Sequence, residues 1–569
     1  MVGHSGRRAT MPGLRRALMA GSILCGVAAI APGAMAIEFE TGTPDFKLRF
    51  DNTLKYSGVA RVAGRQGQLA DRPPFTQGFD DGDRNFGRGL VSNRVDLLSE
   101  LEASYQDFGL RVSGAGWYDT VYRHGNDHDS PATSNNYSVS SRSFTDGTAR
   151  VMGGKAELLD AFVSGRGQIA DMPLSLRAGR FAQQWGESIF FGANAVAGGM
   201  APVDVAKLTA VPNATFRETI RPVGQVSANL QVNANVSIGA YWQFEHGYNR
   251  LPAAGSYFAT SDNLPDGGES ILVTTIGNTR NILTRAKDVK PNGLEQLGGQ
   301  VKFRVPGLEP EFGVYALLFD GKAAATTYSS PVAASPVANL AANLRQAGQF
   351  RWVYPEKTQL YGVSANQSFD EVNVGLEMSM RRNAALASFP QALSAAGFSG
   401  AGSDNPRFAV GDTVHANLSA VWDIGRNPLS EEASLMGEVA FNGRLRMTAN
   451  PAALDPNADR YAVASRFLLS LGYRQVLPGL DLRVPIGFSY SPAGRASALS
   501  SGFAVDKGGD ISIGVAGTYD GVWNVSLGYT HYYGKADSFL NGVTGQNYQT
   551  FGQALADRDF VALSLYRTF

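Results

Sequence analysis

The sequence predicts an all-β fold, a transmembrane antiparallel up-and-down β-barrel of about 18 strands (16–20), with a signal peptide and one candidate inward-folded loop. Three observations predict it. Apolar and polar residues alternate along nearly the whole chain, short and long connections alternate between these segments, and the last ten residues form an amphipathic strand that ends on Phe569. Because an unpaired sticky edge is a hazard, such a strand indicates the closure of a ring.

The N-terminus has the pattern of a secretory signal peptide. The pairs Arg7–Arg8 and Arg15–Arg16 precede an apolar run over 17–31, and the small residues of Ala34–Ala36 follow it. This order of charged, apolar and small residues is typical of a segment removed on export, so we expect cleavage near Ala36. The single cysteine, Cys25, lies inside this leader, and the mature chain is therefore expected to have no disulfide.

Period-two alternation identifies the strands within residues 37–569, which we assign to the barrel. Residues 46–57, 236–245 and 372–381 each place apolar side chains on one face and polar side chains on the other. Each segment has roughly ten residues, the length that a tilted strand needs to cross a bilayer. The candidate strands begin near residues 46, 94, 110, 155, 173, 223, 236, 297, 311, 358, 372, 411, 433, 463, 480, 509, 522 and 559.

The connections between these strands differ in length at the two ends. Short turns are predicted at 106–109, 233–235, 306–310, 368–371, 475–479 and 520–521. Long loops are predicted at about 63–93, 123–154, 184–222, 246–296, 320–357, 382–410, 443–462, 491–508 and 534–558. Outer-membrane barrels have short periplasmic turns and long outer loops.

Aromatic residues gather at both ends of the predicted strands. Tyr105, Tyr473, Tyr519 and Trp523 fall at the turn ends, and Tyr56, Tyr122, Tyr490 and Tyr533 fall near the loop ends. Two such girdles are typical of the two interfaces of a membrane. A soluble sandwich or propeller also shows alternation, but it has no use for two girdles or for long loops on one side.

Charged residues on the polar faces predict a wet interior. A lysine or arginine facing lipid near the midplane costs about 2–4 kcal/mol. A ring of this width is also too wide for its own wall to fill. We therefore expect these residues to face inward: Lys47, Arg49, Asp51, Lys55, Arg94, Asp96, Glu100, Arg111, Glu377 and Arg381. A barrel of this kind has a polar lumen and is expected to act as a channel, not as a barrel with a filled interior.

The segment 184–222 differs from the other long connections. An apolar, glycine-rich stretch over 185–208 is followed by paired charges. It either folds inward as a constriction or plug, or packs on its neighbours as an outer loop. The candidate lumen and constriction residues are Arg49, Arg180, Trp185, Glu187, Phe190, Asp204, Lys207, Arg217, Glu218 and Arg221.

No catalytic site, metal site, cofactor or nucleic-acid partner is expected. His124 and His128 share a polar loop with two aspartates, but regular ligand spacing is lacking and a solvated loop is the expectation. His415, Asn417 and Ser419 share one face of a strand, where their spacing leaves them too far apart for one hydrogen-bonded triad. The chain has 50 basic and 50 acidic residues and no basic stripe.

Seven short motifs make the chain resemble a known family. In order, they are Asn52–Tyr56, Trp185–Ser188, Pro202–Val205, Tyr241–Glu245, Tyr257–Phe258, Leu360–Ser364 and Arg558–Val561. They resemble a Gram-negative outer-membrane family known only as domain of unknown function number 1302. The resemblance implies the outer membrane as location and supplies no catalytic residue. It also implies two partners, a periplasmic lipoprotein-like protein and an RND-type transporter.

Three functions remain open from the sequence. The first is a channel that moves hydrophobic or amphipathic small molecules or lipids across the outer membrane. The partners implied by the family resemblance and the apolar stretch 185–208 favour it. The alternatives are a general porin for small polar solutes and a non-conducting adhesion or assembly barrel. All three imply contact with outer-membrane lipids and with the barrel-assembly machinery. An apolar pocket near Trp185 and Phe190 would favour the first.

Overall fold

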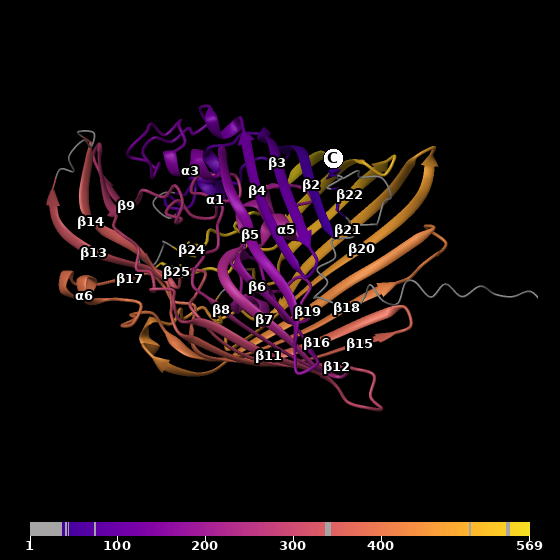
Figure 1. The fold of residues 1–569 in the computed structure, drawn as a ribbon. Coiled ribbons are helices and arrows are strands. Elements are labelled where there is room, and N and C mark those ends of the chain that lie inside the picture. Colours follow the sequence, from indigo (N-terminus) through magenta and orange to yellow (C-terminus); the bar gives the residue numbers. More distant parts are fainter. Residues whose placement is uncertain are drawn as a thin grey trace, which may run out of the picture.

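The structure is a computed structural model that describes residues 37–39, 42–43, 45–72, 76–335, 343–499, 502–503, 505–541 and 547–569. The predicted signal peptide, residues 1–36, lies outside this part of the chain. The main sheet has 19 strands, of which the short β1 (Ile37–Phe39) pairs with β2 beside the ring. The other strands form a closed antiparallel barrel, so the predicted fold class is confirmed (Figure 1).

The ring follows the order of the chain. Its strands are β2 (Phe46–Arg61), β3 (Gly89–Tyr105), β4 (Phe108–Asp119), β5 (Gly154–Ile169), β6 (Met172–Phe181), β7 (Val223–Asn233), β8 (Val236–Gln243), β11 (Gln296–Arg304), β12 (Glu311–Phe319), β15 (Thr358–Phe369), β16 (Val372–Ala385), β18 (Val410–Asp423), β19 (Glu432–Ala449), β20 (Tyr461–Leu477), β21 (Leu480–Ala493), β22 (Gly509–Tyr519), β23 (Trp523–Tyr533) and β26 (Phe560–Thr568). Strand β26 pairs antiparallel with β2, from Thr53 opposite Thr568 to Arg61 opposite Phe560, and this pairing closes the ring.

Alternate residues of each strand face outward and inward. In β3, the outward Val95 and Leu97 are 44% and 43% exposed, whereas the inward Arg94 and Asp96 are each 4% exposed. The exposed apolar side chains form the surface that such a barrel presents to lipid. No helix among the described residues has the length and apolar character needed to cross a membrane.

The seam between β21 and β22 is interrupted near its middle. Between β21 and β22 the pairing runs from Leu480 to Arg483 and resumes at Ile486, so Val484 and Pro485 have no partner on β22. Proline has no backbone N–H to donate to a neighbouring strand. The opposite residue in register is Gly514, which pairs with Gly528 on its other side.

The long connections gather at one end of the barrel, as predicted (Figure 1). They contain a second sheet in the order β17-β13-β14-β10-β9 and a small pair β24–β25, neither of which the sequence predicted. The strands are β9 (Ser270–Ile276), β10 (Thr279–Arg285), β13 (Thr326–Ser335), β14 (Leu344–Val353), β17 (Gln391–Ala392), β24 (Leu540–Asn541) and β25 (Tyr548–Gln549). Because three different connections supply the second sheet, these connections form one folded layer, which we call the cap.

Short helices complete the cap: α1 (Gly67–Ala70), α2 (Asp81–Arg84), η1 (Val121–Arg123), α3 (Asp146–Val151), α6 (Ala395–Gly400) and η3 (Pro451–Ala453). At the opposite end the strands are joined by short turns, and the structure adds turns at 170–171 and 424–431 to those predicted. Several of these turns place a residue in the left-handed region, for example Gln106 with φ of 49° and Asp520 with φ of 49°. Such residues are typical of tight hairpins between antiparallel strands.

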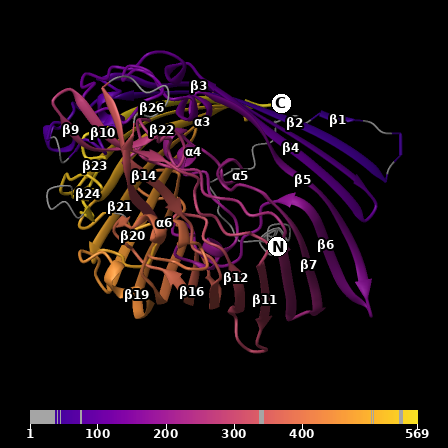
Figure 2. The same cartoon turned by 90° about the vertical axis from the view of Figure 1, so that its left-hand side faces the viewer.

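The connection 182–222 adds no strand to the cap sheet but contacts the cap, because the Arg250 backbone N–H donates to the Val203 carbonyl at 2.9 Å and Ala206 packs with Tyr257. It contains η2 (Val196–Gly199), α4 (Val205–Ala210) and α5 (Phe216–Thr219), and we call it the inner loop. In Figure 2, α4 and α5 lie toward the middle of the ring of strands. Of the two arrangements that the sequence left open, the structure has the inward-folded one, since the inner loop contacts inward-facing residues on strands from β2 to β23.

Candidate functional site

An apolar cluster anchors the beginning of the inner loop to the wall. Trp185, Val196 and Met200 pack against inward-facing apolar residues of β8, β12 and β15, namely Tyr241, Tyr315, Leu317, Phe319 and Leu360. The Trp185 and Tyr241 rings meet edge to face with centroids 5.0 Å apart. Trp185 is 7% exposed, so it fastens the loop to the wall and does not line an apolar pocket.

A single carboxylate of β19 holds the loop tip, which we define as residues 187–195. Glu438 Oε2 accepts hydrogen bonds from the backbone N–H groups of Ile189 and Phe191, each at 3.0 Å, and from that of Phe190. Its Oε1 accepts the Ser188 hydroxyl at 2.8 Å. Glu438 is 1% exposed, and these donors satisfy a charge that would otherwise be costly to bury.

Two charged residues of β16, which lies two strands away from β19 in the same part of the wall, also hold the loop tip. Glu377 accepts the backbone N–H of Glu187 at 2.8 Å and that of Val196 at 2.5 Å. Arg381 Nη2 donates to the carbonyl oxygens of residues 193, 194 and 195, each at 2.9 Å. The inward orientation predicted for Glu377 and Arg381 is confirmed, and backbone groups of the loop are their partners.

The polar face of β18 completes this attachment. His415 Nδ1 makes a 2.8 Å hydrogen bond with Asn194 Oδ1, and Asn194 Nδ2 donates to Asn417 Oδ1 at 2.9 Å. The Ser419 hydroxyl donates to the Glu187 carbonyl at 2.8 Å. The three side chains face the lumen, as expected, and each contacts the loop tip.

The second half of the inner loop reaches the opposite side of the barrel. Lys55 of β2 makes an ion pair with Glu218 at 3.1 Å. Lys207 of α4 lies 3.7 Å from Asp96 of β3. Asn213 Nδ2 donates to the Ser526 hydroxyl of β23 at 2.6 Å. The inner loop is therefore tied to both sides of the ring and divides the lumen.

The charges beneath α4 surround one aromatic ring. The cationic groups of Arg94, Arg250 and Lys207 lie 4.9, 5.4 and 5.9 Å from the centroid of Trp117. Asp204 balances this positive charge, because it accepts from Arg250 at 2.7 Å and caps α4 through the Lys207 backbone N–H at 2.9 Å. The predicted residues Asp204, Lys207 and Glu218 are thus brought together.

The remaining predicted residues lie at other places. Glu187 accepts from Asn366 at 3.0 Å, and Arg49 pairs with Asp51 at 2.7 Å toward the turn end of β2. Arg180 pairs with Glu245, Arg221 donates to the Tyr248 carbonyl, and the Arg217 side chain lies outside the described part. The structure therefore does not gather all ten candidates into one constriction.

Exposure of the inward-facing positions shows where the lumen is open. On β16, β18 and β19 these positions are buried under the loop tip, as for Glu377, His415 and Asn442. On β22 and β23 they remain half-buried: Ser512, Gly514, Ala516, Thr518, Asn524, Ser526, Gly528 and Thr530. We call these eight positions the open wall. The inner loop touches this wall at Ser526, to which Asn213 donates, and accessible space remains at the other positions, several of which carry little or no side chain.

The residues nearest this space combine apolar and charged groups. Ile189 and Phe190 of the loop tip are half-buried, and Leu208 of α4 is 55% exposed. Arg466 of β20 lies 5.8 Å from the Phe190 ring centroid and 3.5 Å from Asp510 of β22. Phe190, a predicted constriction residue, is thus half-buried beside a charged pair of the wall.

The cap contains a polar cluster that the sequence did not predict. His128 is buried, and its Nε2 lies 3.0 Å from Asp81 Oδ1, so the expectation of a solvated loop is wrong for this histidine. Its neighbour Asp129 accepts from Arg65 and Arg84, each at 2.7 Å. Although burial acts to raise it, these hydrogen bonds lower the pKa of Asp129 to about 2.

Several solved structures of bacterial proteins are similar to this chain. OccAB1 of Acinetobacter baumannii is 10% identical over 95% of this chain and 99% of its own, with a TM-score of 0.43. OccAB2 of the same organism is 8% identical over 92% and 98%, with a TM-score of 0.40. OccK2 (OpdF) of Pseudomonas aeruginosa, solved in complex with glucuronate, is 11% identical over 92% and 98%, with a TM-score of 0.36. None of these three reaches a TM-score of 0.5.

Sequence comparison gives the family. Among curated proteins, none matches this chain significantly. The model of one family, described as "Protein of unknown function (DUF1302)", matches residues 17–569. This match confirms the resemblance inferred from the motifs. The chain therefore belongs to the DUF1302 family.

Proposed function

We propose that this protein is an outer-membrane channel of a Gram-negative bacterium that moves amphipathic organic molecules through the space between the inner loop and the open wall. One observation carries the proposal. The inward-facing positions of β22 and β23 stay accessible, whereas those of β16, β18 and β19 are covered by the loop tip. The inner loop therefore narrows the lumen on one side and leaves a passage on the other.

The chemistry of the two sides favours a solute with one apolar and one polar face. Small and polar residues form the open wall, and the hydroxyl groups of Ser512 and Thr530 offer donors and acceptors. The opposite side offers Ile189 and Phe190. Ligand sites commonly combine apolar surface with a few placed polar groups, and this passage has that composition.

A general porin for small polar solutes is the second candidate, because the open wall is polar along its length. The two functions differ in what limits passage. If Phe190 contacts the solute, its removal weakens the transfer of amphipathic molecules. If the passage is only a water-filled bore, removing the ring widens it and speeds the transfer of every small solute.

Transport by proteoliposomes that contain the full mature chain tests the proposal. The variant is Phe190→Ser, and the matched control is Phe539→Ser in the cap, where the side chain is 43% exposed. Burial of a large apolar side chain is worth about 1.5–3 kcal/mol, so we expect amphipathic uptake to fall at least about 10-fold in Phe190→Ser. Glucose entry should not fall, and the control should match the wild type. Equal acceleration of both solutes would favour the porin, and no flux in the wild type would overturn both.

The predicted partners stay predictions. The family resemblance implies a periplasmic lipoprotein-like protein and an RND-type transporter, which would deliver or remove an amphipathic solute at the turn end of the barrel. Chemical cross-linking in intact cells, with a tag on the barrel, tests this association. Recovery of neither partner at native expression levels would count against it.

A further inference from the structure

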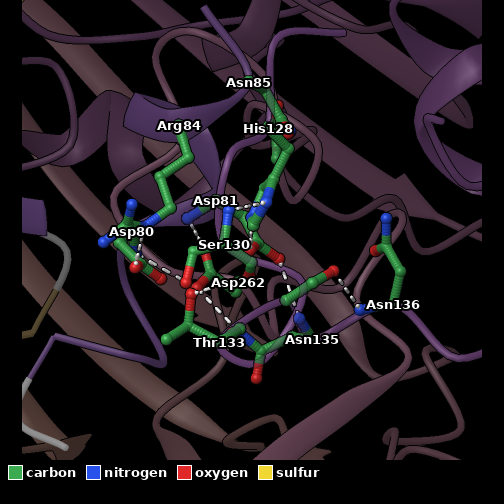
Figure 3. Close-up of polar contacts among 12 residues, drawn as sticks. Asp80, Asp81, Arg84, Asn85, His128, Ser130, Thr133, Asn135, Asn136 and Asp262 are labelled. Carbon is green, nitrogen blue, oxygen red and sulfur yellow. Dashed lines mark hydrogen bonds and ion pairs between the residues drawn. The ribbon is translucent and has the colours of Figure 1, made fainter. Parts of the chain in front are cut away.

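Three buried carboxylates meet in the cap, where three connections come together. Asp80 and Asp81 lie at the start of α2, and Asp262 comes from the connection between β8 and β11 (Figure 3). One carboxylate oxygen of each lies within 4.8 Å of the other two. Their exposures are 0%, 4% and 3%.

Five of the six carboxylate oxygens have hydrogen-bond partners. Asp262 Oδ1 accepts the Asp81 backbone N–H at 3.2 Å, and Asp262 Oδ2 accepts Asn135 Nδ2 at 2.9 Å and the Asp80 backbone N–H at 3.2 Å. Asp81 is bonded by His128 Nε2 at 3.0 Å and by the Asn135 backbone N–H at 3.1 Å. These bonds hold the three carboxylates in fixed positions around one point.

The sixth oxygen is different. Asp80 Oδ2 accepts from Arg84 Nε at 2.5 Å, but Asp80 Oδ1 is buried without a hydrogen-bond partner. The Thr133 hydroxyl lies beside the Asp80 carboxylate and interacts with it, but this hydroxyl is placed to donate to the Ser130 carbonyl at 3.2 Å (Figure 3). A buried acceptor without a donor costs about 1–3 kcal/mol, and more for a charged group. A bound cation would remove this cost, because it satisfies a carboxylate oxygen as a donor does.

The charge around the cluster is also unbalanced. Arg84 is the cation that bonds Asp80, and it also bonds Asp129 at 2.7 Å and Asp71 at 3.0 Å. One guanidinium is therefore shared by three carboxylates, while Asp81 and Asp262 have no arginine or lysine in ion-pair contact among the described residues. Buried charges of one sign are normally paired or bound to a metal.

We propose that Asp80, Asp81 and Asp262 bind a hard divalent cation, and that Ca²⁺ is the ion that fits. The candidate ligands are all oxygen atoms, which favours Ca²⁺ or Mg²⁺ over zinc or copper. Ca²⁺ accepts an irregular set of ligands at about 2.3–2.6 Å, whereas Mg²⁺ demands near-ideal octahedral geometry. The site joins the connections that follow β2 and β8, with His128 and Asn135 as supports from the connection that follows β4. The bound ion would make this part of the cap rigid.

Binding of Ca²⁺ to the full mature chain in detergent tests the site directly. Equilibrium dialysis with ⁴⁵Ca²⁺ should show one saturable site per chain. Sites in extracellular modules bind with Kd values of about 10⁻⁴–10⁻³ M, which sets the concentration range. Asp262→Asn should weaken binding at least about 10-fold, because the number of charged ligands sets the affinity. Asp459→Asn, an acid-to-amide change at a cap residue that pairs with Arg495 and makes no hydrogen bond or ion pair with the cluster among the described residues, should bind as the wild type does.

A protection experiment with the unchanged protein removes the concern that a variant distorts the cap. EGTA should make the wild-type cap more sensitive to protease, and Ca²⁺ but not Mg²⁺ should restore protection. The inference is overturned if the wild type shows no saturable Ca²⁺ binding, if EGTA leaves cleavage unchanged, or if Asp262→Asn and Asp459→Asn bind Ca²⁺ equally well.

Discussion

Replacing Glu438 by alanine should free the loop tip. Its carboxylate accepts four hydrogen bonds from residues 188–191, three of them from backbone N–H groups that have no other acceptor on β19. Alanine removes the acceptor and leaves those donors facing a short methyl group. The barrel wall should persist, because the strand pairing of β19 does not depend on this side chain.

The size of the effect follows from these four bonds. Hydrogen bonds to charged groups contribute about 1.5–3 kcal/mol each. Burying the carboxylate offsets part of this, so we take about 1 kcal/mol net for each bond, or about 4 kcal/mol in total. Every 1.4 kcal/mol changes an equilibrium tenfold, so the ratio of attached to detached loop tip should fall by roughly a thousandfold.

Single-channel conductance in planar bilayers and thiol labelling both report this change. The only cysteine of the chain, Cys25, falls in the predicted leader, so Gly192→Cys introduces a single reactive group into the mature chain. A Cβ at Gly192 meets only the Ala197 Cβ at 3.9 Å, so the substitution fits. We expect higher conductance and faster maleimide labelling in Glu438→Ala. The matched control is Glu432→Ala, since Glu432 lies on the same strand and pairs with Arg474. If Glu438→Ala and Glu432→Ala behave alike, the carboxylate does not hold the loop.

Three further predictions concern the same interior and the cap. Arg381→Met removes the donor to three loop carbonyls and should also raise the rate of thiol labelling at Gly192→Cys. In the double variant with Glu438→Ala, the two effects on labelling should be non-additive, because both residues hold the same loop tip. Simple additivity would contradict this shared attachment. Trp185→Ala should destabilise the anchored loop by about 3–5 kcal/mol and raise the same labelling rate. Trp422→Ala, on the outer surface, is the control and should leave the rate unchanged. Equal labelling rates in these two variants would refute the role of Trp185 as an anchor. Burial lowers the pKa of His246 to about 4 from 6.5. Its contribution of about 3 kcal/mol to the free energy of unfolding is therefore present above pH 6.5 and is lost as the pH falls toward 4. Protease cutting of the cap should therefore rise at pH 5, and His246→Phe should flatten that dependence; an unchanged pH profile in the variant would argue against it.

The strands were predictable because their signal is local. Period-two alternation fixes which residues share a face, and turn residues fix where the chain reverses. The predicted start near 372 coincides with β16, and that near 522 lies one residue before β23. The inward orientation of Lys55, Arg94 and Glu377 follows from the same alternation.

The attachment of the inner loop was not predictable from that signal. Alternation places Glu438 on the inner face, but its partners lie about 250 residues earlier in the chain, and nothing local connects the two. Trp185 illustrates the same limit, because an apolar residue in a lumen loop suits both a passage and a buried anchor. The cap sheet was missed because its strands are short and pair across different connections.

The interrupted seam between β21 and β22 has a mechanical consequence for the cylinder. Because Val484 and Pro485 are not paired with β22, the middle of this seam should resist stretching of the wall less than the paired parts of the same seam. Breathing of the barrel should concentrate there, and deuterium should enter the amide that faces β21 at Gly514 or Val515 sooner than the amides of the continuously paired residues 413–422 of β18. A barrel that is more flexible along this seam can change its inner diameter while the other strand pairs stay hydrogen-bonded.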